Sequence, residues 1–113
     1  MRGEVTEVKA LSYARVIRLT LKVSGGDVSL EIPQRVLEEV GWDPKPGEKV
    51  EVYLSRGLRR DGWEIVYSGK VYLKKGDRVY LSFGGLIGTV SVKRYLNLGV
   101  GEKVYMGLKR IKE

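Results

Sequence analysis

Apolar and polar residues alternate along most of this chain. Between residues 17 and 23, every second position is Ile, Leu or Val, and Arg, Thr and Lys fill the positions between them. Because successive side chains of a β-strand point to opposite faces, this pattern predicts a strand with one buried face. The same alternation along the chain predicts strands at residues 2–9, 14–23, 28–32, 49–55, 63–74, 78–83, 87–92 and 103–111.

Glycine-rich turns separate several of the predicted strands, as at Gly25–Gly26 and Gly84–Gly85. Many short strands with such turns are typical of all-β folds, and closing a sheet on itself removes its exposed edges. We therefore expect an all-β fold, a closed antiparallel barrel of about eight strands with one short helix, in a single domain spanning residues 1–113.

The short helix is expected at residues 33–40. Pro33 is suited to the first helical position, and Gly41 is suited to the position after the last turn. The apolar residues between them recur at the i, i+1 and i+4 spacing that places them on one face of a helix. A single further turn is expected at residues 93–97.

A short pattern occurs twice in the chain. Residues 28–30 lead to Gly-Glu-Lys-Val at 47–50, and residues 90–92 lead to the same four residues at 101–104. One interpretation is a barrel made of two related halves, with the helix inserted in the first copy. The other is that strand–loop–strand segments with charged turns look alike for local reasons, and the sequence leaves both open.

The composition excludes several kinds of chemistry. The chain has no His and no Cys, so it has no imidazole base, no thiolate nucleophile, no disulfide and no zinc site built on these residues. Its serines therefore have no histidine to activate them. The glycine-rich run at 84–88 is not followed by the Lys-Ser/Thr pair of a phosphate-binding loop. We expect no catalytic residue, no cofactor and no metal.

The chain is strongly basic, since 21 Lys and Arg against 14 Asp and Glu give a net charge of +7. Such a charge attracts a nucleic acid or an acidic protein surface, but it also serves simply to keep a domain soluble. Three residues of one loop are candidates for contacting a nucleic acid or an acidic partner: Arg56, Arg59 and Arg60. Aromatic residues near basic ones, among them Tyr53 and Trp63, are explained either by stacking on bases or by packing.

Composition also bears on where the protein works. Gln and Asn occur once each, and this scarcity beside abundant Lys, Glu and Val is typical of a hyperthermophilic source. No apolar run approaches the ~20 residues of a membrane span, and the first residues do not resemble a signal peptide. We expect a cytoplasmic protein.

Three segments in the second half of the chain resemble one protein family. They are Tyr-Ser-Gly-Lys-Val-Tyr at 67–72, Ser-Phe-Gly-Gly-Leu at 82–86 and Val-Tyr-Met-Gly-Leu-Lys-Arg-Ile at 104–111. In this order and spacing they resemble the eighth, common small subunit of eukaryotic DNA-directed RNA polymerases and the small archaeal polymerase subunit that is its counterpart. The first half matches more loosely, through residues 15–23 and 28–54.

This resemblance implies an OB-like barrel that docks on the largest polymerase subunit. Such a subunit supports assembly or stability of the enzyme and has no catalytic residue of its own. It would meet nucleic acid only weakly, or indirectly as part of the assembly, and no membrane. Two features depart from eukaryotic members: the loop at 56–62 is short and basic rather than long and acidic, and the segment between Gly85 and Gly101 is shorter. Contacts that the family makes through these loops are not expected here.

Within the second motif, five residues are candidates for a partner-binding surface: Ser82, Phe83, Gly84, Gly85 and Leu86. Adjacent glycines let a second chain approach the backbone closely, and a strand edge there would accept a partner strand by β-addition. Leu86 would supply an apolar anchor. Paired glycines are also typical of a bulge or a barrel corner, and the two interpretations are compatible.

A second, shorter resemblance covers residues 32–52. The Ile-Pro helix start, the Gly stop and the Pro-Gly turn into a strand resemble the swapped-hairpin DNA-binding domains of AbrB-type transcription regulators. A stand-alone nucleic-acid-binding barrel, or such a DNA-binding regulator, is therefore the alternative to a polymerase subunit. The remainder of the chain has no place in an AbrB-type domain.

Overall fold

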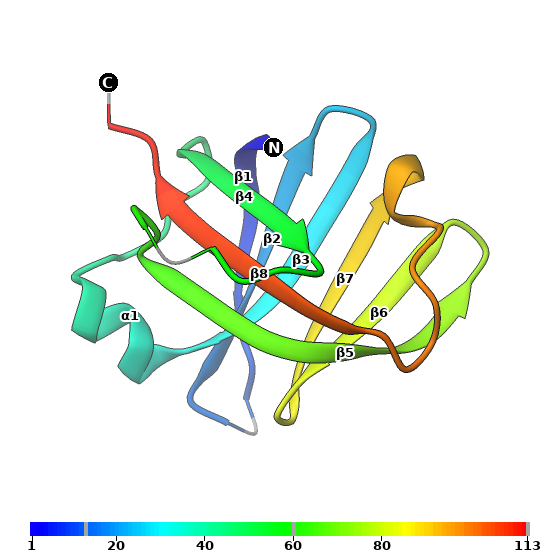
Figure 1. Ribbon diagram of the computed structural model, residues 1–113. Coiled ribbons are helices and arrows are strands. Elements are labelled where there is room, and N and C mark those ends of the chain that lie inside the picture. Colours follow the sequence, from blue (N-terminus) through cyan, green and yellow to red (C-terminus); the bar gives the residue numbers. More distant parts are fainter. Residues whose placement is uncertain (13, 60, 113) are drawn as a thin grey trace.

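The computed structural model describes residues 1–12, 14–59 and 61–112. Within them, eight strands, one α-helix and one 3-10 turn follow one another along the chain (Figure 1). In order they are β1 Arg2–Ala10, β2 Val16–Val23, β3 Gly26–Pro33, α1 Gln34–Val40, β4 Lys49–Ser55, β5 Ile65–Lys75, β6 Arg78–Phe83, β7 Leu86–Val92, η1 Lys93–Tyr95 and β8 Lys103–Arg110. Every predicted strand is present, with boundaries within two residues of those expected.

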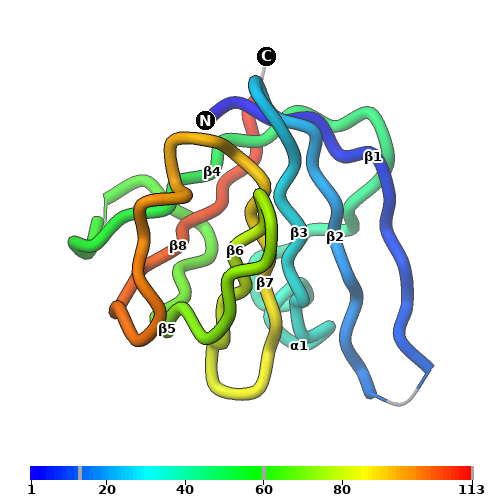
Figure 2. Tube along the Cα trace, turned by 90° about the vertical axis from the view of Figure 1, so that its right-hand side faces the viewer, coloured from blue at the N-terminus to red at the C-terminus, as the bar shows by residue number. Residues whose placement is uncertain are grey.

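The strands form one closed antiparallel ring in the order β1-β2-β3-β7-β6-β5-β8-β4. Figure 1 shows β4, β8 and β5 crossing in front of β2, β3 and β7, and Figure 2 shows β6 and β7 from the adjacent side. The pair β1–β4 closes the ring over a short ladder with Gly3 opposite Val50 at its centre. Met1 extends this ladder, because its backbone carbonyl accepts a 2.8 Å hydrogen bond from the N–H of Val52. The expected closed barrel with one short helix is therefore confirmed.

The inward face of the alternating pattern forms one continuous core. Buried Val, Ile and Leu side chains from all eight strands fill the barrel, together with Phe83 and Met106. Trp42, which follows α1, and Leu98, which follows η1, join the same cluster. Removing this apolar surface from water is the main force that stabilises such a fold.

The helix α1 begins where β3 ends. Pro33 precedes the helix with extended backbone angles, so it is the residue before the helix rather than the first helical residue that was expected. Gly41 ends the helix with a φ of 67°, a left-handed conformation that favours glycine. Leu37 is buried, and Val36 and Val40 pack partly against the core. The amphipathic pattern therefore predicted the helix correctly, apart from one residue at its start.

The ring consists of two topologically equivalent halves. Exchanging β1, β2, β3 and β4 with β5, β6, β7 and β8 leaves the order of strands around the ring unchanged. In each half, α1 or η1 lies between the third and the fourth strand. The second and third strands of each half are joined by a two-residue turn, Ser24–Gly25 or Gly84–Gly85. This arrangement favours the interpretation of the repeated pattern as two related halves.

Backbone hydrogen bonds repeat in detail between the halves. The N–H of Val5 donates to the carbonyl of Glu48 at 2.9 Å, and the carbonyl of Val5 accepts from the residue before Glu48 at 2.8 Å. Val71 makes the same two bonds with Glu102, at 3.0 Å, and with the residue before it, at 2.8 Å. A β-bulge follows Val5 and Val71 alike. The two Gly-Glu-Lys-Val segments therefore occupy equivalent positions in the two halves. The strand segments of the repeated pattern, 28–30 and 90–92, do not, because the structural equivalent of Val28 lies two residues before Val90.

Two cross-strand pairs lie where the halves meet. Ser29 on β3 faces its equivalent, Thr89 on β7, with 2.6 Å between their hydroxyl oxygens. Tyr53 on β4 faces its equivalent, Gly107 on β8. Equivalent residues that face each other mark an internal two-fold axis, and at the second pair the two residues differ greatly in size.

Candidate interaction surfaces

The segment Ser82–Leu86 forms the tip of the β6–β7 hairpin. Gly84 and Gly85 make its two-residue turn with φ values of 62° and 96°, which favour glycine. Phe83 is 5% exposed and belongs to the core. Ser82 is paired on both sides, with β5 and with β7. Phe83 is therefore a core residue, and the glycine turn matches the alternative of a barrel corner. Among the described residues, Leu86 pairs with β6 alone, so a strand edge of the kind expected remains at the hairpin tip.

Beyond this hairpin tip, the ring of backbone pairing opens. β3 pairs with β7 only as far as Leu30, and β5 pairs with β6 only from Lys70 onward. Residues 31–33 of β3 and 65–69 of β5 therefore have a partner strand on one side only. We name this opening the seam: these two edges bound it, and the turn Gly84–Gly85 lies at its base.

Two side chains make hydrogen bonds at the seam: one crosses it from β5 to β3, and the other joins β3 to β7 at its base. The hydroxyl of Tyr67 on β5 donates to the backbone carbonyl of Glu31 at 3.3 Å, and its ring lies 5.2 Å from that of Phe83. The carboxylate of Glu31 accepts from the N–H of Ile87 at 2.8 Å and from the guanidinium of Arg18 at 3.3 Å. Burial raises the pKa of Tyr67 well above its usual value, so the hydroxyl stays a neutral donor. Side chains thus supply bonds where the backbone ladder is interrupted.

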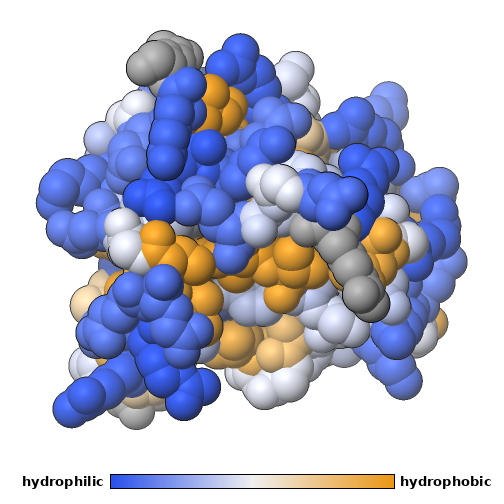
Figure 3. Space-filling view, turned by 60° about the vertical axis from the view of Figure 1, so that its left-hand side comes forward, coloured by the Kyte–Doolittle hydropathy of each residue, from blue (hydrophilic) through white to orange (hydrophobic). Residues whose placement is uncertain are grey.

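Apolar side chains border the seam. Val66, on the free edge of β5, is 39% exposed, and Leu86, directly after the turn, is only partly buried. Figure 3 shows hydrophobic side chains, in orange, gathered in a band across the side of the molecule that carries α1. Val36 and Val40 are the partly buried apolar residues of that helix. A continuous apolar patch with a polar surround is typical of a protein–protein contact.

The loop after β4 folds back onto the outside of the barrel. Tyr53 lies across Gly107, where an added Cβ atom would come within 2.6 Å of the tyrosine ring. The hydroxyl of Tyr53 donates to the carbonyl of Arg59 at 3.0 Å, and the Arg59 guanidinium lies 5.3 Å from the centre of the same ring. Trp63 packs edge to face on Tyr53 at 4.6 Å, and the ammonium of Lys109 lies 4.7 Å from the Trp63 ring. The stack therefore consists of two rings packed on each other with a cation at each end.

The stack continues into a basic stretch of β8. The ammonium of Lys103 lies 5.4 Å from the ring of Tyr105, and Lys103 faces Lys70 directly across the β5–β8 ladder. Glu51, opposite Lys109, lies instead 3.7 Å from the N-terminal ammonium. Among the described residues, neither these lysines nor the cations of the stack form an ion pair with a carboxylate. We name this surface the basic face; it consists of Arg59, Lys70, Lys103, Lys109, Tyr53, Trp63 and Tyr105.

The three basic candidates of the sequence have different surroundings. Arg59 belongs to the stack. Arg56 forms an ion pair with Glu102 at 2.9 Å, and this hydrogen bond holds the pKa of Glu102 below its usual value. Arg60 lies outside the described residues. Only Arg59 is therefore placed on the basic face.

Arg110, at the end of β8, ties the helix to the barrel. Its guanidinium donates to the carbonyls of Val40 at 3.0 Å and Gly41 at 3.2 Å, where α1 ends, and to the carboxylate of Glu64 at 3.0 Å. Hydrogen bonding to Arg110 lowers the pKa of Glu64. The strands on either side of α1 find their partners within this chain, whereas a swapped-hairpin domain interleaves two copies. The structure thus favours a local origin for the AbrB-type resemblance.

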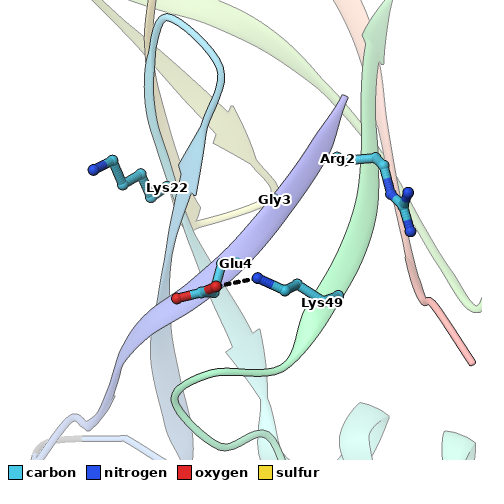
Figure 4. Close-up of a pocket in the computed structure, with 5 residues that line it drawn as sticks. All are labelled: Arg2, Gly3, Glu4, Lys22 and Lys49. Atoms are coloured by element: carbon cyan, nitrogen blue, oxygen red, sulfur yellow. Dashed lines mark hydrogen bonds and ion pairs between the residues drawn. The ribbon is translucent and has the colours of Figure 1, made fainter. Parts of the chain in front are cut away.

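A shallow basin beside β1 offers little for a ligand. It is lined by Arg2, Gly3, Glu4, Lys22 and Lys49 (Figure 4). Glu4 is engaged by Lys49, and this hydrogen bond lowers the pKa of the carboxyl. Figure 4 shows the side chains of Arg2 and Lys22 pointing away from Glu4 on either side. Binding sites need polar groups that converge, and these diverge.

No protein-family model matches this chain, and no curated protein matches it. In residues 1–12, 14–59 and 61–112, no cluster of three or more acidic side chains is arranged to hold a metal ion. The same residues contain no helix with the length and apolar character needed to cross a membrane. The seam, the basic face and the motifs that contribute to them are therefore the features that indicate a function.

Sequence reasoning missed the seam and much of the basic face. Glu31 and Tyr67 occupy ordinary positions in their strands, and the pattern of one strand does not reveal where its neighbour ends. Lys103 and Lys109 meet the aromatic residues only because β8 pairs with β4 and β5. One usable signal is Gly107, since a glycine within an alternating strand indicates a close approach by another group.

Proposed function

We propose that this protein is a non-catalytic small subunit of DNA-directed RNA polymerase, which docks on the largest subunit and supports assembly or stability of the enzyme. One observation carries the proposal. The motifs at 67–72, 82–86 and 104–111 are well separated in sequence, yet they lie on β5, on the β6–β7 hairpin and on β8. These elements are neighbours in the ring, in the order β6-β5-β8.

All three motifs adjoin the seam. The first supplies part of its free edge, the second supplies the turn at its base, and the third pairs with the other side of the same edge. Residues 65–69 offer five residues of β5 backbone without a second partner strand, beside the exposed apolar side chain of Val66. Free backbone next to apolar pockets is what strand addition uses for affinity and specificity.

We therefore propose that an extended segment of the largest subunit pairs with this edge. The net charge of +7 favours a partner segment rich in acidic residues.

The test is capture of native polymerase from cell lysate with the tagged full-length chain. We expect the largest subunit to co-purify. Val66→Glu combined with Ser68→Glu places two carboxylates on the free edge and should abolish capture, since charges on an edge strand oppose pairing with another chain. Val100→Glu combined with Ser24→Glu adds the same charge at exposed sites outside the seam and should leave capture intact.

Two outcomes would overturn the proposal. One is recovery of the tagged chain without any polymerase subunit. The other is equal loss of capture by the two double variants, provided that both melt cooperatively at the temperature of the unmodified chain. In that case the seam would not be the docking surface.

A further inference from the structure

The basic face borders the seam along β5, where Ser68 lies opposite Tyr105, but the proposed docking uses none of its cations or rings. It brings together four cations, none of which forms an ion pair with a carboxylate in the part of the chain that the structure describes, and two partly exposed rings, those of Trp63 and Tyr105. We propose that this face binds single-stranded nucleic acid, with its cations on the phosphates and these two rings stacked on bases.

The electrostatic argument starts from the lysines. Lys70 and Lys103 face each other across the β5–β8 ladder, and like charges in this position are unfavourable. Their repulsion is relieved when an anion lies between them. The ammonium groups of Lys103 and Lys109 each lie over a ring face, at 5.4 and 4.7 Å from the ring centres. An exposed cation–π contact is weak compared with a charge-assisted hydrogen bond, so either ammonium can exchange it for a phosphate oxygen.

The aromatic residues favour a nucleic acid over an acidic peptide. When a lysine moves to a phosphate, it vacates the face of Trp63 or Tyr105, and a base can take its place. Stacking of this kind tolerates any base, because every base has a π face. Tyr53 has a different role: it is 4% exposed and holds the loop in position through the carbonyl of Arg59.

The shape of the face favours a single strand over a duplex. Lys103 and Lys109 are six residues apart on β8, which is ~20 Å along a strand. The cations thus form a track along the sheet, with rings between them. In a duplex the base faces are stacked on one another, so rings poised to stack would have nothing to contact.

The test is fluorescence anisotropy of labelled 12-nucleotide oligo(U) and oligo(dT) with the full-length chain over a series of salt concentrations. We expect binding that weakens as salt rises. Lys103→Ala combined with Lys109→Ala should reduce the slope of log K against log salt by about 1.4, since each phosphate contact on a single strand contributes ~0.7. Comparing the RNA and DNA probes tells which backbone the face prefers.

The matched control is Lys9→Ala combined with Lys22→Ala. It removes the same charge from exposed positions on β1 and β2, away from the basic face, and should leave the slope unchanged. Tyr105→Leu keeps the charge and the apolar bulk but removes the π face, and it should weaken binding about tenfold.

Three results would overturn this proposal. The first is no binding of either probe at low salt, and the second is an equal change of slope in both double variants, which would indicate diffuse attraction to net charge. The third is a Tyr105→Leu variant that binds the oligonucleotides as tightly as the unmodified chain, together with a poly-glutamate peptide that binds as tightly as the oligonucleotides. This result would indicate an acidic protein partner. Because the assay contains no polymerase, its failure and the failure of polymerase capture are distinguishable.

Discussion

Replacing Gly107 by Ala places a methyl group where the ring of Tyr53 already lies. The new Cβ atom would come within 2.6, 2.9 and 3.0 Å of three atoms of that ring. Gly107 is not among the glycines with positive φ, so the backbone itself accepts Ala and the penalty comes from the contact alone. Trp63 packs against the ring at 4.6 Å, and the ring therefore cannot move without disturbing the stack.

The cost follows from what must be displaced. Forcing an extra methyl group into a filled site costs about 1–3 kcal/mol. If the ring moves, the hydrogen bond from Tyr53 to Arg59 is lost, at about 1 kcal/mol, and the edge-to-face contact with Trp63, at about 0.5–1.5 kcal/mol. Because strain and displacement are alternatives, the cheaper of the two sets the cost, and we expect Gly107→Ala to lower the free energy of unfolding by about 1–2.5 kcal/mol, or Tm by roughly 10 °C at most.

A double-mutant cycle measured by urea unfolding tests this reasoning. In a Tyr53→Ala background the ring is absent, so Gly107→Ala should cost almost nothing, and it gains about 0.4–1 kcal/mol from the reduced freedom of the unfolded chain. The coupling energy should therefore be about 1.5–3.5 kcal/mol. An equal loss of stability from Gly107→Ala in both backgrounds would show that the contact with Tyr53 is not the cause.

Three further predictions concern the barrel itself. Gly69→Ala should destabilise the protein far more than Gly3→Ala at the equivalent position of the other half. The Cβ added at Gly69 would lie 2.1 Å from a backbone oxygen, whereas the Cβ added at Gly3 would lie 3.0 Å from a side-chain carbon. Equal melting temperatures of the two variants would contradict this. Hydrogen bonding to Arg110 lowers the pKa of Glu64, so this carboxyl stabilises the fold above its unfolded pKa near 4.5 and loses that effect as the pH falls below it. Glu64→Gln should thus lower Tm at pH 7 and flatten part of its decline in acid, and a parallel decline would refute the assignment. Tyr67→Phe removes the bond across the seam, at about 1 kcal/mol. Because burial raises the pKa of Tyr67 above 10.0, the same variant should lose less stability above that pH, as thermal melts at pH 9 and 11 would reveal.

Alternation predicted the barrel because burying one face of a strand imposes a period of two on the sequence. Alternation does not reveal which strands pair with each other. β3 pairs with β7, which lies far along the chain, and this ladder stops at Leu30. Because it stops there, the side chain of Glu31 accepts the hydrogen bond from the backbone of β7. Gly84 and Gly85 indicated a turn correctly, since their φ values suit glycine, but not that the strand before them is paired on both sides. Arg56 and Arg59 look alike in sequence, and only the structure separates an ion pair from a stack.

The internal two-fold symmetry distinguishes structural features that both halves share from features that only one half has. Val5 and Val71 carry the same backbone bonds, so these features serve both halves and are explained by the fold. Three features differ between the two halves. α1 has seven residues where η1 has three, β5 has eleven where β1 has nine, and Tyr53 faces a glycine. A packing requirement shared by both halves does not account for features that only one half has. Because the extra length of β5 makes the free edge of the seam, and Tyr53 anchors the basic face, both proposed surfaces depend on these departures, and interactions with other molecules are expected there.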